Sequence, residues 1–422
     1  MRSAIKIGGQ FSGVGAFDSA LDRLGIKYDN IYQAEWDKYA RLTYLHNHKS
    51  PKYYVEDVNN TPIEEITENY GSLDIAMFSP PCQSFSLAGK RLGKDDKRGI
   101  LFFNSHEFIT KNKPRYFIFE NVKGLLSDDS GKTFSEWLHL LGGKSVNGMP
   151  IVFPYDGAVP YHVYWKVLNA KDFGVPQNRE RVFIIGIRDD VDNDFSFPKE
   201  VPLTKRLKDV LESEVDEKYY LSEKMIAGLV NHTNNSKEKG SGFAFNPKTK
   251  EDVGNCITSR VFKMGVDDNY IQETPTLKQV GSLYGSDIIT HNMMPRSGDP
   301  KKGGTGHLQR NDGIAYCLDT GNTNAVEILV LNDTKHSQQR IYNTEGISPS
   351  ILSGSNGGGQ SPVKHLTTTK RIRKLTPREC FRLMDFPDTF DFSVVSNSQA
   401  YRQAGNSIVV NVLAQIIKKL KL

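Results

Sequence analysis

The stretch Leu73-Asp74-Ile75-Ala76-Met77-Phe78-Ser79-Pro80-Pro81-Cys82-Gln83 contains an apolar run that stops at two prolines. Such a short apolar run predicts a buried strand. Because proline cannot donate a hydrogen bond to a sheet ladder, the chain must leave the sheet at Pro80. Cys82 is therefore expected on a loop at the end of a strand, where ligands bind in doubly wound α/β sheets. A thiolate placed there can act as a covalent nucleophile, and the alternative is a buried structural cysteine.

Similar strand-like runs lie on both sides of this stretch, and helical patterns separate several of them. After the first run, apolar residues from Phe17 to Leu24 recur at helical spacing, and Gly25 is placed to end that helix. The alternation predicts an α/β fold with a doubly wound, mostly parallel sheet. The further runs are 5–7, 31–36, 53–58, 116–122, 163–168 and 182–187.

The composition is that of a globular chain long enough for two domains. Of its 422 residues, 38% are hydrophobic and 24% are charged, and no apolar stretch approaches the length of a membrane span. The four cysteines form no CxxC pair, which argues against a zinc site and a disulfide framework and fits a reducing cytoplasm. The net charge of +5 permits a nucleic-acid partner without demonstrating one.

Positions at the ends of the first three runs are candidates for binding a small-molecule cofactor. Gly13 and Gly15 lie between a strand and a helix, where glycines let backbone N–H groups approach a ligand; a plain tight turn is the alternative. The third glycine of a dinucleotide fingerprint is absent, so a bound pyrophosphate is not favoured. Glu35 is placed to accept hydrogen bonds from a ribose, unless it is only a solvated carboxylate, and Asp57 could meet an adenine amino group.

Charged residues also follow the later runs. Glu120 ends a buried run, and a partly desolvated carboxylate there is suited to donate a proton to a substrate. Arg179 and Arg181 share a face if their segment is extended, and together they could grip a carboxylate, a phosphate or a base carbonyl. A structural ion pair is the alternative for these arginines. The basic segment 88–99 is expected either to contact phosphates or to be a plain surface loop.

The character of the chain changes at about Asp189, where the regular alternation of strands and helices stops. Gly, Asn, Ser and Thr become frequent through residues 230–370. Residues 313–321 match residues 346–354, and their interleaved apolar residues favour short strands over low-complexity disorder. We therefore expect a second, smaller, irregular β-rich domain.

The end of the chain returns to helical patterns. Thr376-Pro377-Arg378-Glu379 is a capping box that predicts the start of a helix. Gly405-Asn406-Ser407 is expected to form a turn that opens an apolar helix from Ile408 to Leu420. Such a turn would offer backbone amides to a ligand.

In this order, the pieces resemble the cytosine-C5 DNA methyltransferases of bacteria and phages. The resemblance covers most of the chain outside residues 200–370, where that family keeps a target recognition domain. One departure is Ala16, where many members have a second consecutive glycine. The segments that carry the resemblance are Phe11-Ser12-Gly13-Val14-Gly15, Glu35, Asp57, Pro80-Pro81-Cys82-Gln83, Glu120-Asn121-Val122, the set Gln177, Arg179 and Arg181, Arg373-Lys374-Leu375-Thr376-Pro377-Arg378-Glu379, and Gly405-Asn406-Ser407.

The resemblance implies a Rossmann-like enzyme that uses S-adenosylmethionine and needs no metal. It would methylate carbon 5 of a flipped-out cytosine in a short, specific sequence of double-stranded DNA, through a covalent adduct with Cys82. Residues 1–198 plus 398–422 would form the catalytic and cofactor-binding domain. Residues 199–397 would form the target recognition domain, with a hinge and helical return segment at 370–397.

The resemblance also implies roles for single residues. Besides Cys82, the catalytic residues would be Glu120, on the ring N3 and exocyclic amine of the base, with Arg181 and Arg179 near the base carbonyl. The residues implied to bind S-adenosylmethionine are Phe11, Gly13, Gly15, Glu35, Trp36, Asp57, Val58, Pro80, Leu101, Asn406 and Ile408. The residues implied to contact DNA are Gln83, Ser84, Arg91 and Arg98.

Two other functions compete with this interpretation. One branch of the family methylates transfer RNA, and the large variable region argues against that branch. The other is a catalytically inactive DNA-binding homologue, and the intact Cys82, Glu120, Arg179 and Arg181 argue against it. The expected role is restriction–modification or phage self-protection. The expected setting is a monomer in the cytoplasm of a bacterial or phage-infected cell, with any companion restriction endonuclease acting separately.

Overall fold

The computed structural model describes residues 4–81, 100–191, 194–238, 244–273 and 371–422, and five short strands between residues 289 and 366. These residues group into two compact units. The first unit comprises residues 1–271 and 373–422, and the second comprises residues 272–372. The parts of the expected recognition domain at 199–271 and 373–397 thus group with the first unit.

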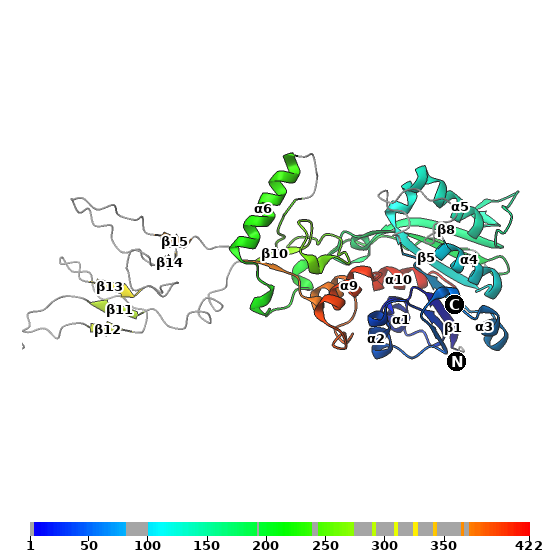
Figure 1. The fold of residues 1–422 in the computed structure, drawn as a ribbon, viewed down its shortest axis with the longest axis horizontal. Coiled ribbons are helices and arrows are strands. Elements are labelled where there is room, and N and C mark those ends of the chain that lie inside the picture. The colour runs from blue at the N-terminus through cyan, green and yellow to red at the C-terminus, as the bar shows by residue number, and fades with distance from the viewer. Residues whose placement is uncertain are drawn as a thin grey trace, which may run out of the picture. The chain divides into compact units, whose positions relative to one another are not determined.

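A nine-stranded sheet forms the centre of the first unit (Figure 1). In spatial order its strands are β3 (Tyr53–Val55), β2 (Tyr28–Ala34), β1 (Ile5–Gln10), β4 (Ile75–Phe78), β5 (Tyr116–Val122), β9 (Glu180–Arg188), β8 (Tyr161–Asn169), β6 (Ser145–Val146) and β7 (Met149–Pro150). The strands from β3 to β5 are parallel, and β9 is antiparallel to both of its neighbours. The chain winds outward in opposite directions from β1 and β4, so the predicted doubly wound, mostly parallel sheet is confirmed.

Side chains alternate between the two faces of the sheet, and both faces are buried. In β4, Ile75 and Met77 belong to one apolar cluster, whereas Ala76 and Phe78 belong to the other. This two-residue period follows from the pleat, and burial on both faces explains why the strand is apolar throughout. In β4, the first polar side chain, Ser79, therefore comes directly after the strand, at its carboxyl end.

Helices cover both faces. One face is covered by α1 (Ala16–Arg23), α2 (Lys38–Asn47) and α10 (Val410–Ile417), and the other by α3 (Ile63–Tyr70), α4 (Ile100–Asn112) and α5 (Lys132–Leu141). As predicted, α1 ends before Gly25, which has a positive φ of 65°. Short 3-10 helices lie at η1 (Val58–Asn60), η3 (Lys123–Gly131), η4 (Ala170–Phe173), η5 (Leu207–Asp209), η6 (Glu217–Tyr219) and η7 (Val261–Lys263).

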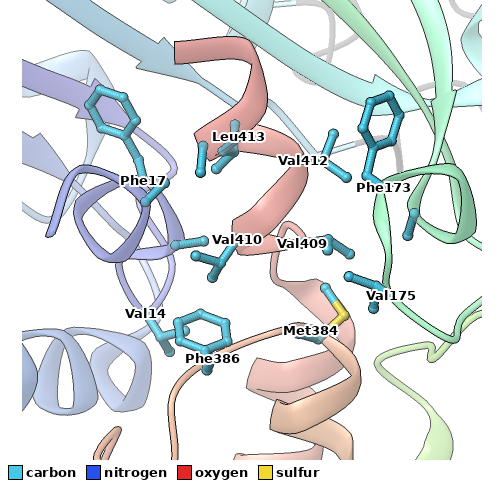
Figure 2. Packing of buried hydrophobic residues seen from close by; sticks show 14 of the residues in the cluster. Val14, Phe17, Phe173, Val175, Met384, Phe386, Val409, Val410, Val412 and Leu413 are labelled. Atoms are coloured by element: carbon cyan, nitrogen blue, oxygen red, sulfur yellow. The ribbon is translucent and has the colours of Figure 1, made fainter. Parts of the chain in front are cut away.

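The last helix, α10, is apolar on two sides because it packs between two parts of the unit. Figure 2 shows Leu413 pointing toward Phe17 of α1 and Val412 pointing toward Phe173 of η4. All four side chains belong to the same buried cluster. Through these contacts α10 packs against both α1, which follows β1, and η4, which precedes β9.

The expectation of a turn at Gly405-Asn406-Ser407 was wrong. Gly405 and Asn406 are the last residues of α9 (Asn397–Asn406), and α10 begins only at Val410. Arg179 supplies the reason, because its Nη2 donates to the carbonyl oxygens of Gly405 and Ser407, at 3.1 and 2.7 Å. Ser407 is extended, with φ −73° and ψ 167°, so the chain leaves α9 there and crosses to α10.

The remaining helices and strands lie outside the nine-stranded sheet of the first unit or belong to the second unit. The predicted capping box is confirmed at the start of α8 (Pro377–Leu383), where Thr376 and Glu379 cap each other. The other elements around it are α6 (Glu223–Glu238) and the two-stranded sheet of β10 (Tyr270–Glu273) and β16 (Arg371–Lys374). The second unit holds an antiparallel sheet of β12 (Leu308–Arg310), β11 (Ile289–Asn292) and β13 (Asn324–Glu327), and a parallel pair, β14 (Ile341–Asn343) and β15 (Lys364–Leu366).

Candidate active site

The carboxyl ends of β1 and β4 form the point where the strand order reverses, which is the usual ligand site of a doubly wound sheet. After β1 the backbone turns sharply, with φ of 61° at Phe11, 55° at Gly13 and 86° at Gly15. A side chain on Gly15 would place its Cβ 2.4 Å from the ring of His48, so only glycine fits. No described atom lies within 4 Å of the position that a Cβ on Gly13 would occupy. The turn is thus packed against His48 at Gly15, whereas the space next to Gly13 is open.

Glu35 lies directly after β2 and is tied to this turn. Its Oε2 accepts from the backbone N–H of Gly13 at 2.8 Å, and its Oε1 accepts from that of Asp37 at 2.8 Å. Burial raises the pKa of Glu35, and the two backbone hydrogen bonds partly oppose that shift. Two donors on different oxygens hold the carboxylate plane in one orientation, with lone pairs left for a ligand.

Trp36 is the next residue, and its side chain is 76% exposed. Its backbone is nevertheless held, because Arg41 Nη1 donates to the carbonyl oxygens of Glu35 and Trp36 at 2.9 and 3.0 Å. Arg41 also contacts Glu56, just after β3. A fixed backbone that presents a large aromatic ring to solvent is suited to stacking against a ligand.

Asp57 follows β3 as the N-cap of η1, and its Oδ1 accepts from the backbone and side-chain amides of Asn59 at 3.0 and 2.7 Å. Asn59 in turn accepts from Asn104 of α4 at 3.1 Å. Val58 is buried, and Leu101 packs against the same apolar cluster. The structure thus brings Asp57, Val58 and Leu101 to the β3 side of the site.

Two cross-strand contacts join the ends of β4 and β5. The Oγ of Ser79 lies 3.3 Å from Oε2 of Glu120, and the Nδ2 of Asn121 donates to the carbonyl oxygen of Pro80 at 3.2 Å. Glu120 and Asn121 are both buried. These contacts anchor the last residues before Cys82 to the neighbouring strand.

Arg181 and Arg179 have different surroundings. The Nε of Arg181 lies 3.1 Å from Oε1 of Glu120, whereas Arg179 is only 3% exposed. Besides the carbonyl oxygens at the end of α9, Arg179 donates to that of Ile257 at 2.7 Å. Burial lowers the pKa of Arg179 to about 10, and the nearby charge of Arg181 adds to the shift. The structure therefore places Arg181 against the candidate acid and Arg179 in a backbone clamp.

The other predicted residues lie as follows. Pro80 is buried, Ile408 is half-buried against the core, and Asn406 is exposed at the end of α9. Cys82 and the predicted DNA contacts Gln83, Ser84, Arg91 and Arg98 lie outside the residues that the structure describes, as do the matching segments 313–321 and 346–354.

Sequence reasoning missed three residues that shape the site: Ser79, Asn59 and Arg41. Ser79 carried a local signal, because it is the polar residue between an apolar strand and Pro80. Asn59 and Arg41 carried none for their contacts with Asn104 and Glu56, because these partners lie on other elements of the fold.

Known proteins with similar sequences identify the family of this chain. The model of the family C-5 cytosine-specific DNA methylase matches residues 5–422. The chain belongs to this family. It is therefore a cytosine-C5 DNA methyltransferase, and membership implies S-adenosylmethionine as methyl donor and DNA as substrate.

Similar members of the family come from phages and bacteria. The orphan methyltransferase M.SPRI of Bacillus phage SPR is 32% identical, over 97% of this chain and 96% of that protein. The orphan methyltransferase M.Rho11sI of Bacillus phage rho11s is 31% identical, over 99% and 98%. The type II methyltransferase M.HpaII of Haemophilus parainfluenzae is 30% identical, over 97% and 87%.

Solved structures share the fold at lower identity. A DNMT2 mutant from Spodoptera frugiperda is 19% identical, covers 98% of this chain and 99% of its own, and has a TM-score of 0.60. The Entamoeba histolytica methyltransferase EhMeth is 17% identical, covers 99% and 98%, and has a TM-score of 0.61. In the described part of the chain, every helix is too short or too polar to cross a bilayer.

Proposed function

We propose that this methyltransferase acts on one cytosine within a short, specific sequence of double-stranded DNA, with Cys82 as nucleophile and Glu120 as the group that holds the base. The observation that carries the proposal is the buried carboxylate of Glu120, held by Ser79 and Arg181 at the end of the strand pair that leads into Cys82. A carboxylate with that position and those partners is suited to form hydrogen bonds with the polar edge of a substrate base.

The chemistry starts from the poor nucleophilicity of carbon 5 of cytosine. Attack of the Cys82 thiolate on carbon 6 would turn the ring into an enamine, which makes carbon 5 nucleophilic. Glu120 would hold the ring N3 and the exocyclic amine, and so stabilise the charge that develops on the ring. Arg181, which already contacts Glu120, would lie near the base carbonyl.

The carboxyl ends of β1, β2, β3 and β4 would bind the adenosyl and methionine parts of the cofactor. The open space above Gly13 is a cradle that any Cβ would fill, and Trp36 presents an exposed ring beside the fixed carboxylate of Glu35. Glu35 would bind the ribose hydroxyls and Asp57 the adenine amine, with Trp36 and Val58 flanking the adenine. The remaining contacts would come from Phe11, Gly15, Pro80, Leu101, Asn406 and Ile408. When bound, S-adenosylmethionine supplies an electrophilic methyl group.

The substrate base has to leave the duplex, because its carbon 6 is inaccessible inside the stack. Gln83, Ser84, Arg91 and Arg98 would contact DNA around the flipped base. Residues 199–397 would read the target in the major groove, with the hinge segment at 370–397. By the family resemblance, Arg179 would also act near the base carbonyl and the backbone around Cys82. These assignments stay predictions.

Relatives support a setting for the enzyme. Two similar proteins are phage orphan methyltransferases and one is a bacterial type II methyltransferase. The proposed role is therefore phage self-protection or restriction–modification, by a cytoplasmic monomer. A companion endonuclease, where one exists, would act separately.

The test is methyl transfer by the full chain. The protein is incubated with labelled S-adenosylmethionine and unmethylated DNA, and the modified cytosines are mapped by bisulfite sequencing. Methylation within a short fixed motif, abolished in Cys82→Ala with cofactor binding retained, supports the proposal. Transfer to transfer RNA instead of DNA, or full activity of Cys82→Ala, would overturn it.

A further inference from the structure

Ser79 and Glu120 occupy neighbouring positions on parallel strands. The register pairs Ile75 with Tyr116 and Phe78 with Phe119, so the next position along brings Ser79 beside Glu120. The backbone of Ser79 is fixed independently, because its N–H lies 3.4 Å from the carbonyl oxygen of Gln10, the last residue of β1. Ser79 is thus attached to β1 through its backbone and to β5 through its hydroxyl.

Glu120 of β5 lies between Ser79, which directly follows β4, and Arg181 of β9. Arg181 is two positions along β9 from Phe183, the direct partner of Glu120. Met77, Ile118 and Phe183, two residues from Ser79, Glu120 and Arg181 respectively, all belong to the same buried cluster. Because side chains alternate along a strand, Ser79, Glu120 and Arg181 all project from that same face. The carboxylate therefore has one donor on each side, at 3.3 Å from Ser79 and 3.1 Å from Arg181.

The two donors differ in one chemical property. A guanidinium group is positively charged and only donates hydrogen bonds, so its contact with Oε1 of Glu120 disfavours a proton on that oxygen. A serine hydroxyl both donates and accepts, so its contact with Oε2 is compatible with the charged and the protonated carboxyl group. A proton shared between Glu120 and a substrate base can therefore reside on Oε2, while the Ser79 hydroxyl donates to a remaining lone pair of that oxygen.

We infer that Ser79 is a positioning residue for this reaction: it orients the Glu120 carboxyl group and, together with Arg181, reserves Oε2 for the proton shared with the base. The inference rests on the proposed role of Glu120. Loss of Ser79 is expected to lower the rate of methyl transfer rather than the affinity for DNA or cofactor, because Ser79 acts through the carboxyl group of Glu120.

The experiment measures kcat and KM for methyl transfer by the full chain, on DNA carrying the motif found by bisulfite sequencing. Ser79→Ala is expected to lower kcat about fivefold to tenfold, with both KM values within about twofold of the wild type. Ser79→Thr, which keeps a hydroxyl, should restore most of the rate. Ser127→Ala is the control, because its exposed hydroxyl bonds the nearby carbonyl of Gly124, and its kcat should not change.

A double-mutant cycle separates positioning from a merely structural role. In a Glu120→Gln background, Ser79→Ala should lower the residual rate by less than about twofold, because the carboxyl group that Ser79 orients is already lost. Equal effects of Ser79→Ala in both backgrounds, or a wild-type kcat in Ser79→Ala, would overturn the inference. A wild-type enzyme without activity on DNA would instead refute the proposed function, so the two failures are distinguishable.

Discussion

Arg181 Nε lies 3.1 Å from Glu120 Oε1, and the two side chains are only 17% and 11% exposed. An ion pair so shielded from water depends on both partners, because loss of one leaves an uncompensated charge. The pair also brings a cation to the group proposed to hold the substrate base. Its geometry therefore links the proposed catalytic role of Glu120 to the packing at the end of the sheet.

Replacing Glu120 should separate catalysis from binding. Glu120→Gln keeps the size of the side chain but removes the charge and the shared proton, so kcat should fall about 10²–10⁴-fold, with S-adenosylmethionine affinity retained. Single-turnover transfer and calorimetric titration measure the two quantities. Glu180→Gln, which loses an exposed contact with Lys123, is the matched control and should keep its rate. A Glu120→Gln enzyme that transfers methyl groups at the wild-type rate would contradict the assignment.

Replacing Arg179 should affect stability first. Arg179→Ala leaves three buried carbonyl acceptors, at Ile257, Gly405 and Ser407, without their charged donor. The free energy of unfolding of the first unit should therefore fall by about 3 kcal/mol. Urea unfolding followed by tryptophan fluorescence measures the loss. Arg402→Ala is the control, since that arginine is 51% exposed, and should cost less than about 1 kcal/mol. Equal unfolding midpoints for the two variants would argue against the clamp.

Asp18 of α1 predicts a pH effect. Burial raises the pKa of this carboxyl group to about 7, and its Oδ1 accepts from the hydroxyl of Tyr44 at 2.7 Å. A folded-state pKa above the unfolded value means that stability is greatest below about pH 4 for this group and is lost as the pH rises toward 7. Asp18→Asn should therefore stabilise the protein at pH 8, by about 2–4 kcal/mol, and have little effect at pH 4.

The measurement for Asp18 is the difference in unfolding free energy between the variant and the wild type across this pH range. Burial lowers the pKa of the nearby His48 to about 4, so His48 destabilises the fold as the pH falls below 6.5. That contribution is common to both proteins and largely cancels in the difference. A difference that stays constant from pH 4 to 8 would show that Asp18 is not forced to ionise in a buried position.

The turn from Phe11 to Gly15, which is proposed to bind the cofactor, predicts a position-specific effect of glycine replacement. Gly15→Ala would place a Cβ 2.4 Å from His48 at a φ of 86°, so the turn must shift and S-adenosylmethionine affinity should fall at least about tenfold. Gly25→Ala is the matched control, because its φ of 65° is equally unfavourable but no described atom lies within 4 Å. It should cost about 1 kcal/mol of stability and leave the affinity unchanged. Equal affinities for both variants would show that the turn tolerates a side chain.

Local sequence patterns determined the strands and the helix ends. The run at 116–119 is apolar because β5 is buried on both faces, and Thr376 with Glu379 marks the start of α8 because a capping box is complete within four residues. The order of strand ends also placed Glu35, Asp57 and Glu120 at one edge of the sheet. These features depend on neighbours in the chain, so a single sequence contains them.

Only the tertiary structure decided how the arginines and the end of α9 are used. The spacing of Arg179 and Arg181 predicts a shared face, but their partners come from distant segments: Glu120 for one, and the carbonyls of Ile257, Gly405 and Ser407 for the other. The same clamp ends α9 where a ligand-binding turn was expected. Hydrogen bonds between segments so far apart depend on how the elements pack, and no local pattern of residues encodes that packing.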